Sequence, residues 1–180
     1  MNKNKFKHAF KKASKKVNKK KLYKEELRVQ DKKPVYIGKK GTRNLIIVME
    51  ELAELQEQLI MYLEGDGDKL LIVEEMADVY IGLDHIKLIC DISDKKISKC
   101  KNKKTPKKLL SVIANLSRLQ KRISKFIRGK CDKDDLVEEI SCVYKSLKVI
   151  KKKCGISDKK INKAINVKLN RLEETKGIYK

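Results

Sequence analysis

Apolar residues recur at helical spacing over most of this 180-residue chain. A first apolar stripe predicts a helix over residues 42–64, and a second stripe predicts another over residues 68–90. The turn Gly65-Asp66-Gly67-Asp68 between them is far too short for an EF-hand loop. The residues of the two stripes are Val48, Leu52, Leu55 and Leu59, then Val79, Leu83 and Ile86.

Capping signals predict further helices beyond residue 90. A short third helix is expected, then two long ones and a last helix that ends near residues 176–177. The segment 34–38 is expected to be extended or a turn that leads into the first helix. With only 2 prolines and 8 glycines, the predicted fold class is all-α. The expected cap or start residues are Ser93, Thr105-Pro106, Asp132 and Ser157.

The second half of the chain repeats the first. A shift of 64 residues aligns residues 45–104 with residues 109–168 without a gap, and 26 of the 60 aligned positions are identical. The string Ile92–Ile97 recurs unchanged as Ile156–Ile161. The chain is therefore predicted to be a tandem duplication of one helical hairpin unit.

Acidic residues flank the two apolar stripes, in the motifs Glu50-Glu51-x-x-Glu54 and Glu75-x-x-Asp78. Carboxylates three residues apart share a helix face, so two such helices side by side would bring four of them together. Acidic residues on helices usually form only a solvated face. Half-buried carboxylates repel one another unless a cation neutralises them, and oxygen ligands suit Mg²⁺ or Mn²⁺. The predicted metal ligands are Glu51, Glu54, Glu75 and Asp78.

The two acidic motifs, separated by 20 residues, resemble the signature of the all-α nucleoside triphosphate pyrophosphohydrolases. This superfamily includes the MazG-like enzymes, the dimeric dUTPases and the dCTP pyrophosphatases, and the resemblance covers about residues 44–104. It implies Mg²⁺-dependent hydrolysis of a nucleoside triphosphate to the monophosphate and pyrophosphate. The candidate catalytic residues are then Glu50, Glu51 and Glu54, and either Glu50 or Glu54 could act as the base that activates water.

The resemblance also implies a phosphate-binding segment after the hairpin. Family members carry Lys, Asn and Arg residues there, and the matching positions are Lys101, Asn102 and Lys104. In the second half Lys168 and Arg171 look more like the family's tail, and the second half could lend them to the site in the first half. The alternative is that these cations are simply solvated near helix ends, where the helix dipole favours them.

The second half keeps the apolar positions of the first half but has lost most of its acids. The acids are therefore not needed for the hairpin to fold, which favours a chemical role for them in the first half. Arg118 is expected to pair with Glu138 or Glu139 without any metal. The correspondences are Glu50 to Ala114, Glu51 to Asn115, Glu54 to Arg118, Glu75 to Glu139 and Asp78 to Cys142.

These patterns divide the chain into three regions. Residues 1–40 are expected to form a basic, partly disordered arm, residues 41–104 a MazG-like repeat with intact acidic motifs, and residues 105–180 a degenerate repeat. Because family members often assemble from such hairpins, the resemblance implies a helical bundle with a pseudo-two-fold relation inside one chain. A homo-oligomer of this chain is a further expectation.

Charge is distributed unevenly along this chain of net charge +22. Residues 45–94 contain 2 Lys and 13 Asp or Glu. The flanking regions are basic: residues 1–44 contain 17 Lys or Arg and 3 acidic residues, and residues 95–180 contain 27 Lys or Arg and 8 acidic residues. Such an acidic island suits a metal–triphosphate site, because the surrounding cations attract phosphate. The Lys-rich stretch 1–24 is either a solvated tail or an amphipathic arm able to contact nucleic acid or an anionic membrane.

The five cysteines show no metal-binding spacing and are expected to be reduced thiols in a cytoplasmic protein. Neither a membrane-spanning stretch nor a signal peptide is apparent. No nucleophile triad or glycine-rich phosphate loop is recognisable. Two alternatives to the enzyme stay open: a catalytically weak nucleotide-binding module, and a nucleic-acid-associated protein that uses its basic surface.

Overall fold

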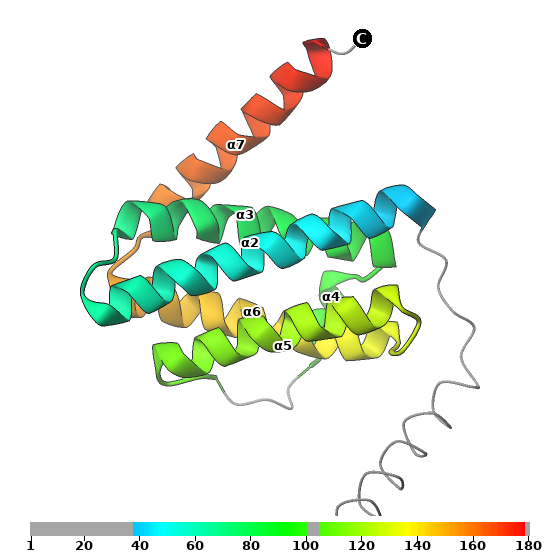
Figure 1. Ribbon diagram of the computed structural model, residues 1–180, viewed down its shortest axis with the longest axis horizontal. Helices are drawn as coiled ribbons and strands as arrows, with labels where there is room; N and C mark the ends of the chain where they lie inside the picture. The colour runs from blue at the N-terminus through cyan, green and yellow to red at the C-terminus, as the bar shows by residue number, and fades with distance from the viewer. Residues whose placement is uncertain (1–37, 101–104, 179–180) are drawn as a thin grey trace, which may run out of the picture. The chain divides into compact units, whose positions relative to one another are not determined.

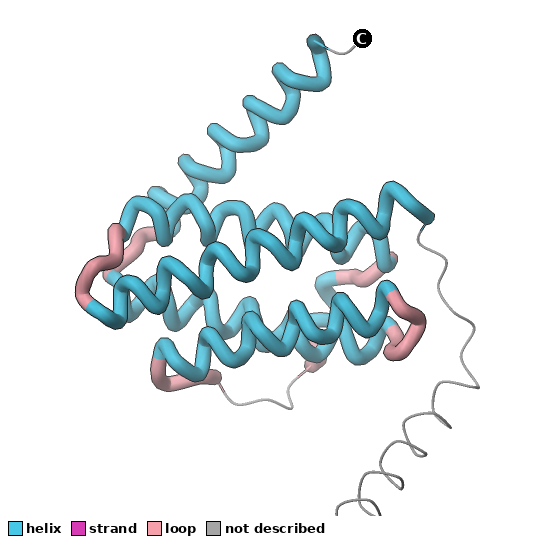
Figure 2. The backbone as a smooth tube through the Cα atoms, viewed as in Figure 1, coloured by secondary structure: helices cyan, strands magenta, loops and turns pink. Residues whose placement is uncertain are grey.

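The computed structural model describes residues 38–100 and 105–178, with side chains described as far as residue 171. Every regular element in these ranges is a helix, which confirms the all-α class for the described part of the chain (Figure 2). None of these helices is long and apolar enough to cross a membrane. The helices are α2 (Gly38–Glu64), α3 (Lys69–Cys90), α4 (Asp94–Ser98), α5 (Leu109–Ile127), α6 (Lys133–Cys154) and α7 (Asp158–Ile178).

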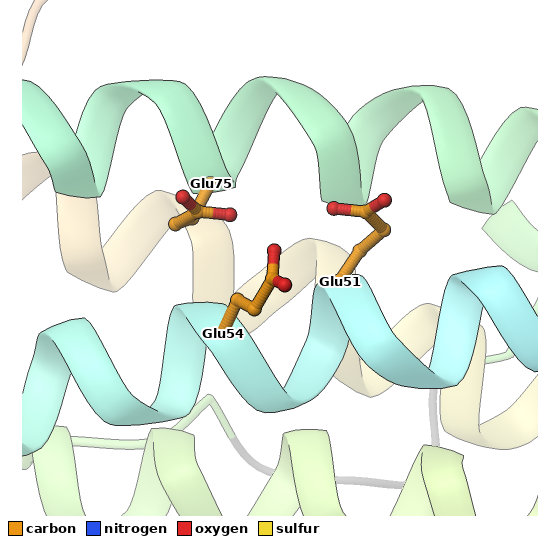
Figure 3. A group of neighbouring side chains, drawn as sticks. All are labelled: Glu51, Glu54 and Glu75. Carbon is orange, nitrogen blue, oxygen red and sulfur yellow. The ribbon is translucent and has the colours of Figure 1, made fainter.

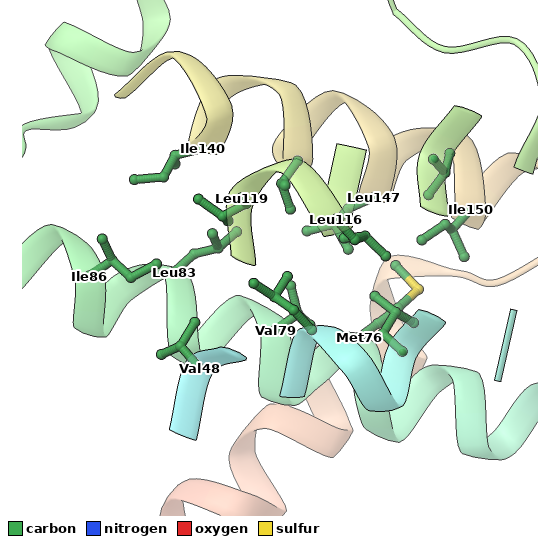
Figure 4. Close-up of a cluster of buried hydrophobic side chains, with 14 of the residues drawn as sticks. Val48, Met76, Val79, Leu83, Ile86, Leu116, Leu119, Ile140, Leu147 and Ile150 are labelled. Carbon is green, nitrogen blue, oxygen red and sulfur yellow. The ribbon is translucent and has the colours of Figure 1, made fainter. Parts of the chain in front are cut away.

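Helices α2, α3, α5 and α6 form two antiparallel hairpins (Figure 1). α2 pairs with α3, α5 pairs with α6, and the hairpins pack together mainly through α2 and α5. Leucine, isoleucine and valine side chains fill the space between the hairpins (Figure 4). Leu52 and its counterpart Leu116 are both fully buried. Burial of one such side chain stabilises the fold by about 1.5–3 kcal/mol, so the repeated apolar stripe holds the bundle together.

Residues 64 positions apart meet where the two hairpins pack. Gln56 Nε2 donates a hydrogen bond to Gln120 Oε1 at 2.9 Å, and the ring centroids of Tyr80 and Tyr144 lie 6.3 Å apart. A residue contacts its own counterpart only near a two-fold axis. These two contacts are therefore the ones that a two-fold relation between the hairpins would require.

The third helix of each half packs on the opposite half. α4 contacts α6, and α7 contacts α3. The two helices begin alike, because Ser93 Oγ accepts from Lys96 N at 3.3 Å and Ser157 Oγ accepts from Lys160 N at 3.4 Å, as expected. α7 continues much further than α4, and Figure 1 shows its C-terminal part extending beyond the two hairpins. The packing of α7 on α3 brings residues of the second half to the helix that carries Glu75.

The capping prediction for α6 is confirmed, and α3 also begins with an acidic N-cap, at the residue where the second helix was expected to start. Asp68 accepts a hydrogen bond from Leu70 N, and Asp132 forms a reciprocal capping box with Asp135. The predicted bounds of the second helix, residues 68–90, agree with α3. The basic arm, as far as residue 37, and the segment 101–104 lie outside the described residues.

Two helix starts differ from the expectation. α2 begins at Gly38, four residues before the expected start at residue 42, and Gly38 has a left-handed φ of 63° rather than an extended backbone. Thr42 Oγ1 donates to the Gly38 carbonyl. The Thr105-Pro106 start signal was wrong, since α5 begins at Leu109 after an N-cap, Lys108, that makes no side-chain capping bond. Leu109 is the first buried side chain of this segment. The helix thus starts where tertiary packing starts, which outweighs the local signal.

Candidate metal centre

Three of the four predicted ligands converge in the space between α2 and α3 (Figure 3). Glu51 and Glu54 extend from α2 toward α3, and Glu75 extends from α3 toward α2. One carboxylate oxygen of each residue lies within 4.8 Å of the other two. Ligand oxygens around one Mg²⁺ lie at most about 4.2 Å apart, so a small change of rotamer would close these three carboxylates around an ion.

The packing of α2 against α3 holds these acids at the edge of the apolar core. Leu52 is fully buried, so the adjacent Glu51 lies at the border between core and solvent. Further along α3, Gly82 is buried against α2, and a Cβ atom there would lie 3.1 Å from Val48 Cγ1. The absence of a side chain at Gly82 lets the two helices approach closely beside the acidic cluster.

Burial and mutual repulsion raise the pKa of two of the clustered carboxyls. The pKa of Glu51 rises from 4.5 to about 7, first through burial and then through repulsion by Asp78 and Glu54. The pKa of Glu75 also rises to about 7, through burial and then repulsion by Glu54 and Asp78, with Lys168 opposing both shifts. Glu75 Oε2 is buried and has no hydrogen-bond partner among the described residues. This donor set fits a divalent cation, which would supply the missing partner and positive charge.

Asp78, the fourth predicted ligand, forms an ion pair with Lys168 and is not part of the three-carboxylate cluster. Asp78 nevertheless lies close enough to repel both Glu51 and Glu75. Lys168 belongs to α7, so the second half of the chain places a cation beside the acids of the first half. The site is thus built from both halves.

The remaining predicted site residues are spread over different places. Glu50 is exposed on α2 and does not join the cluster, so Glu54 is the candidate base that the fold places among the other acids. Arg171 is exposed on α7, about one turn beyond Lys168. The three other phosphate-binding candidates, Lys101, Asn102 and Lys104, lie outside the described residues.

Sequence reasoning overlooked Gln58. This residue lies one turn after Glu54 on the same face of α2. Its Oε1 atom is buried without a hydrogen-bond partner in the described part of the chain. The spacing of four residues between Glu54 and Gln58 could have indicated this position in the sequence. At that spacing the side-chain amide of Gln58 places a neutral oxygen on the helix face that carries Glu54.

The corresponding positions of the second half form one ion pair and two hydrogen bonds. Arg118 Nε lies 3.7 Å from Glu139 Oε2, which confirms the pairing expected from the sequence. Arg118 also donates to Asn115 Oδ1, and Asn115 Nδ2 donates to Ser146 Oγ at 2.8 Å. Glu139 is only 3% exposed, so the guanidinium provides the positive charge that its buried carboxylate needs.

The metal-free protein is expected to lose stability as the pH rises from about 5 to about 7.5. Glu51 and Glu75 lose their protons near pH 4.5 when unfolded but near pH 7 when folded. The folded state therefore binds more protons over this interval, and the free energy of unfolding falls with pH. Each group should contribute on the order of 1 kcal/mol, because solvent screens these partly exposed charges.

Thermal unfolding in the presence of a chelator, followed from pH 5 to pH 8, measures this slope. The double variant Glu51→Gln/Glu75→Gln serves as the control, since it lacks both titrating carboxyls. Its slope should be clearly smaller than that of the wild type. Equal slopes would contradict the raised pKa values.

The chain was also compared with known proteins. No protein-family model, no curated protein and no solved structure matches it. The resemblance to the all-α pyrophosphohydrolases consequently depends on the two acidic motifs alone.

Proposed function

We propose that this protein is a Mg²⁺- or Mn²⁺-dependent nucleoside triphosphate pyrophosphohydrolase, which converts a (deoxy)nucleoside triphosphate to the monophosphate and pyrophosphate. The observation that carries the proposal is the convergence of Glu51, Glu54 and Glu75 in one half of a duplicated scaffold. At the same place in the other half, Arg118 removes the repulsion. A hairpin of this kind therefore folds without the acidic cluster, and acids retained at a cost in stability are expected to bind a ligand.

We infer that the bundle consists of two MazG-like hairpins related by a pseudo-two-fold axis within one chain. Support comes from the contact of Gln56 with Gln120 and of Tyr80 with Tyr144, each pair 64 positions apart. The reciprocal packing of α4 on α6 and of α7 on α3 has the same symmetry. In this arrangement the second half completes the bundle and supplies α7 to the site.

The roles of the chain's own residues follow from their positions. Glu51, Glu54 and Glu75 would hold the ion, with Asp78 beside them as a fourth carboxylate. A divalent ion bound there would offset the negative charge that develops on the phosphate oxygens during the reaction. Glu54 would orient the attacking water and accept its proton, and Glu50 is the alternative base.

Lys168 pairs with Asp78 and lowers the pKa of Glu51 and Glu75, so it is suited to hold the triphosphate. The variant Lys168→Met is expected to lower kcat/KM about tenfold, mostly through a higher KM, because one charge-assisted contact to phosphate is lost. Steady-state kinetics with pyrophosphate detection measure this effect. Lys163→Met removes the same charge from an exposed position on α7 and should leave both constants almost unchanged. Equal losses in the two variants would contradict a specific role for Lys168.

The deciding experiment measures pyrophosphate release from the common ribo- and deoxyribonucleoside triphosphates, with Mg²⁺ and with a chelator. Release that requires the divalent ion is the expected result. Saturable nucleotide binding without release would instead favour the alternative, a nucleotide-binding module. Absence of both from every nucleotide tested would overturn the proposal.

A further inference from the structure

A row of exposed or half-buried cations runs along α5 and ends at its C-cap residue. Arg118, Lys121, Lys125 and Arg128 follow one another at intervals of three or four residues and therefore share a helix face. α5 itself contains no acidic residue. The corresponding positions on α2 carry the opposite charge or none: they are Glu54, Glu57, Met61 and Glu64.

Two acids of α6 pair with cations of α5, and one of these cations is Arg118, the first residue of the row. On α6, Asp135 lies 3.3 Å from Arg122, and Glu139 lies 3.7 Å from Arg118. Lys121 and Lys125 form no ion pair within the described residues, and Arg128 Nε donates only to a backbone carbonyl, that of Ser124, at 3.0 Å. The positive charge from Lys121 onward is therefore not neutralised within the described part of the chain.

The length and composition of the row indicate its ligand. From Arg118 to Arg128 the helix rises about 15 Å. One strand of duplex DNA presents about four phosphates over this distance, at one per 3.4 Å. An anionic membrane fits less well, because surface-bound helices insert apolar side chains and those of α5 pack inside the bundle. The exposed large apolar residue of α5, Leu110, lies at the other end of the helix.

We propose that the exposed face of α5 binds the phosphate backbone of nucleic acid. The contacts are between Lys or Arg side chains and phosphate oxygens, so the affinity depends steeply on salt. The row contains no aromatic residue, so it offers no platform for base stacking and no sequence preference is expected from it. The binding is independent of the pyrophosphohydrolase reaction, because these cations lie on the hairpin without the acidic cluster.

Fluorescence anisotropy of the full-length protein with a labelled, mixed-sequence DNA duplex, between 50 and 300 mM salt, tests this inference. The variant Lys121→Glu/Lys125→Met/Arg128→Glu installs the residues that α2 carries at these positions, which the scaffold already tolerates. Binding should weaken more than tenfold, and the slope of log affinity against log salt should become shallower by about 2.7 for three lost phosphate contacts.

The matched control is Lys152→Glu/Lys153→Met/Lys160→Glu, which changes the net charge equally at exposed positions near the opposite end of the hairpin. It should weaken binding less than threefold. If the triple variant unfolds, the single variant Lys121→Glu provides the test instead. Its slope of log affinity against log salt should become shallower by about 0.9. Equal losses in the triple variant and its control, or no loss in either, would overturn the assignment to α5.

Discussion

Replacing Glu51 by Gln is expected to abolish pyrophosphate release while it makes the metal-free fold more stable. The substitution removes one of three converging carboxylates, and a lost ligand in such a site should lower kcat at least a thousandfold. The same change removes a carboxyl whose pKa is raised to about 7 by burial and by repulsion from Asp78 and Glu54. Above pH 7 the free energy of unfolding should therefore rise on the order of 1 kcal/mol after allowance for solvent screening.

Two measurements check this prediction. Steady-state pyrophosphate release at saturating Mg²⁺ gives the change in kcat, and thermal unfolding with and without Mg²⁺ reports whether the ion still binds. Mg²⁺ should raise the midpoint of the wild type but not that of Glu51→Gln. Glu57→Gln, which removes one charge from an exposed position of α2, is the control and should behave as the wild type. Wild-type turnover in Glu51→Gln would refute the site.

Asp78→Asn separates the catalytic effect from the stability effect. It should lose turnover as Glu51→Gln does. It should not gain stability, because the substitution also removes the ion pair between Asp78 and Lys168. A gain equal to that of Glu51→Gln would mean that the ion pair with Lys168 does not stabilise the fold.

Replacing Arg118 by Met is expected to have the opposite effect on stability, a loss of about 2 kcal/mol. Glu139 is 3% exposed, and Arg118 Nε is 3.7 Å from its Oε2 atom. Removal of one partner leaves a buried carboxylate with an incomplete set of partners, which costs more than the pair itself contributes. Met preserves most of the aliphatic packing of the arginine side chain, so the loss reports chiefly on charge and hydrogen bonding.

Urea unfolding of four proteins measures the coupling between these residues. The set is the wild type, Arg118→Met, Glu139→Gln and the double variant. The double variant should recover most of the stability that Arg118→Met loses, because the buried charge is then gone. An unchanged urea midpoint in Arg118→Met, or a double variant as unstable as the sum of the single changes, would contradict this account.

The opposite effects expected of Glu51→Gln and Arg118→Met on stability test whether the two halves have different roles. In the first half the acidic cluster is expected to lower stability and to bind a ligand. In the second half the guanidinium of Arg118 occupies the same place and is expected to stabilise the fold. A rise in the free energy of unfolding for Glu51→Gln and a fall for Arg118→Met would support a ligand-binding role for the first half and a stabilising role for the second half.

Much of the local structure could be derived from the sequence, because it depends on interactions between residues close together in the chain. The apolar period of 3.6 predicts the long helices, and short-range hydrogen bonds at Asp68, Asp132 and Ser157 determine where three of them begin. The 64-residue repeat also allowed one tertiary contact to be predicted. Arg118 and Glu139 occupy the positions of Glu54 and Glu75, which were expected to face one another.

Only the tertiary structure decided how distant segments complete the site. Lys168 pairs with Asp78 across 90 residues of chain because α7 packs on α3, and no periodicity in the sequence specifies that crossing. The start of α5 at Leu109 has the same origin, since burial in the assembled bundle outweighs the cap signal at Pro106. Local patterns determine which residues share a helix face, whereas the meeting of two faces depends on the packing of the whole core.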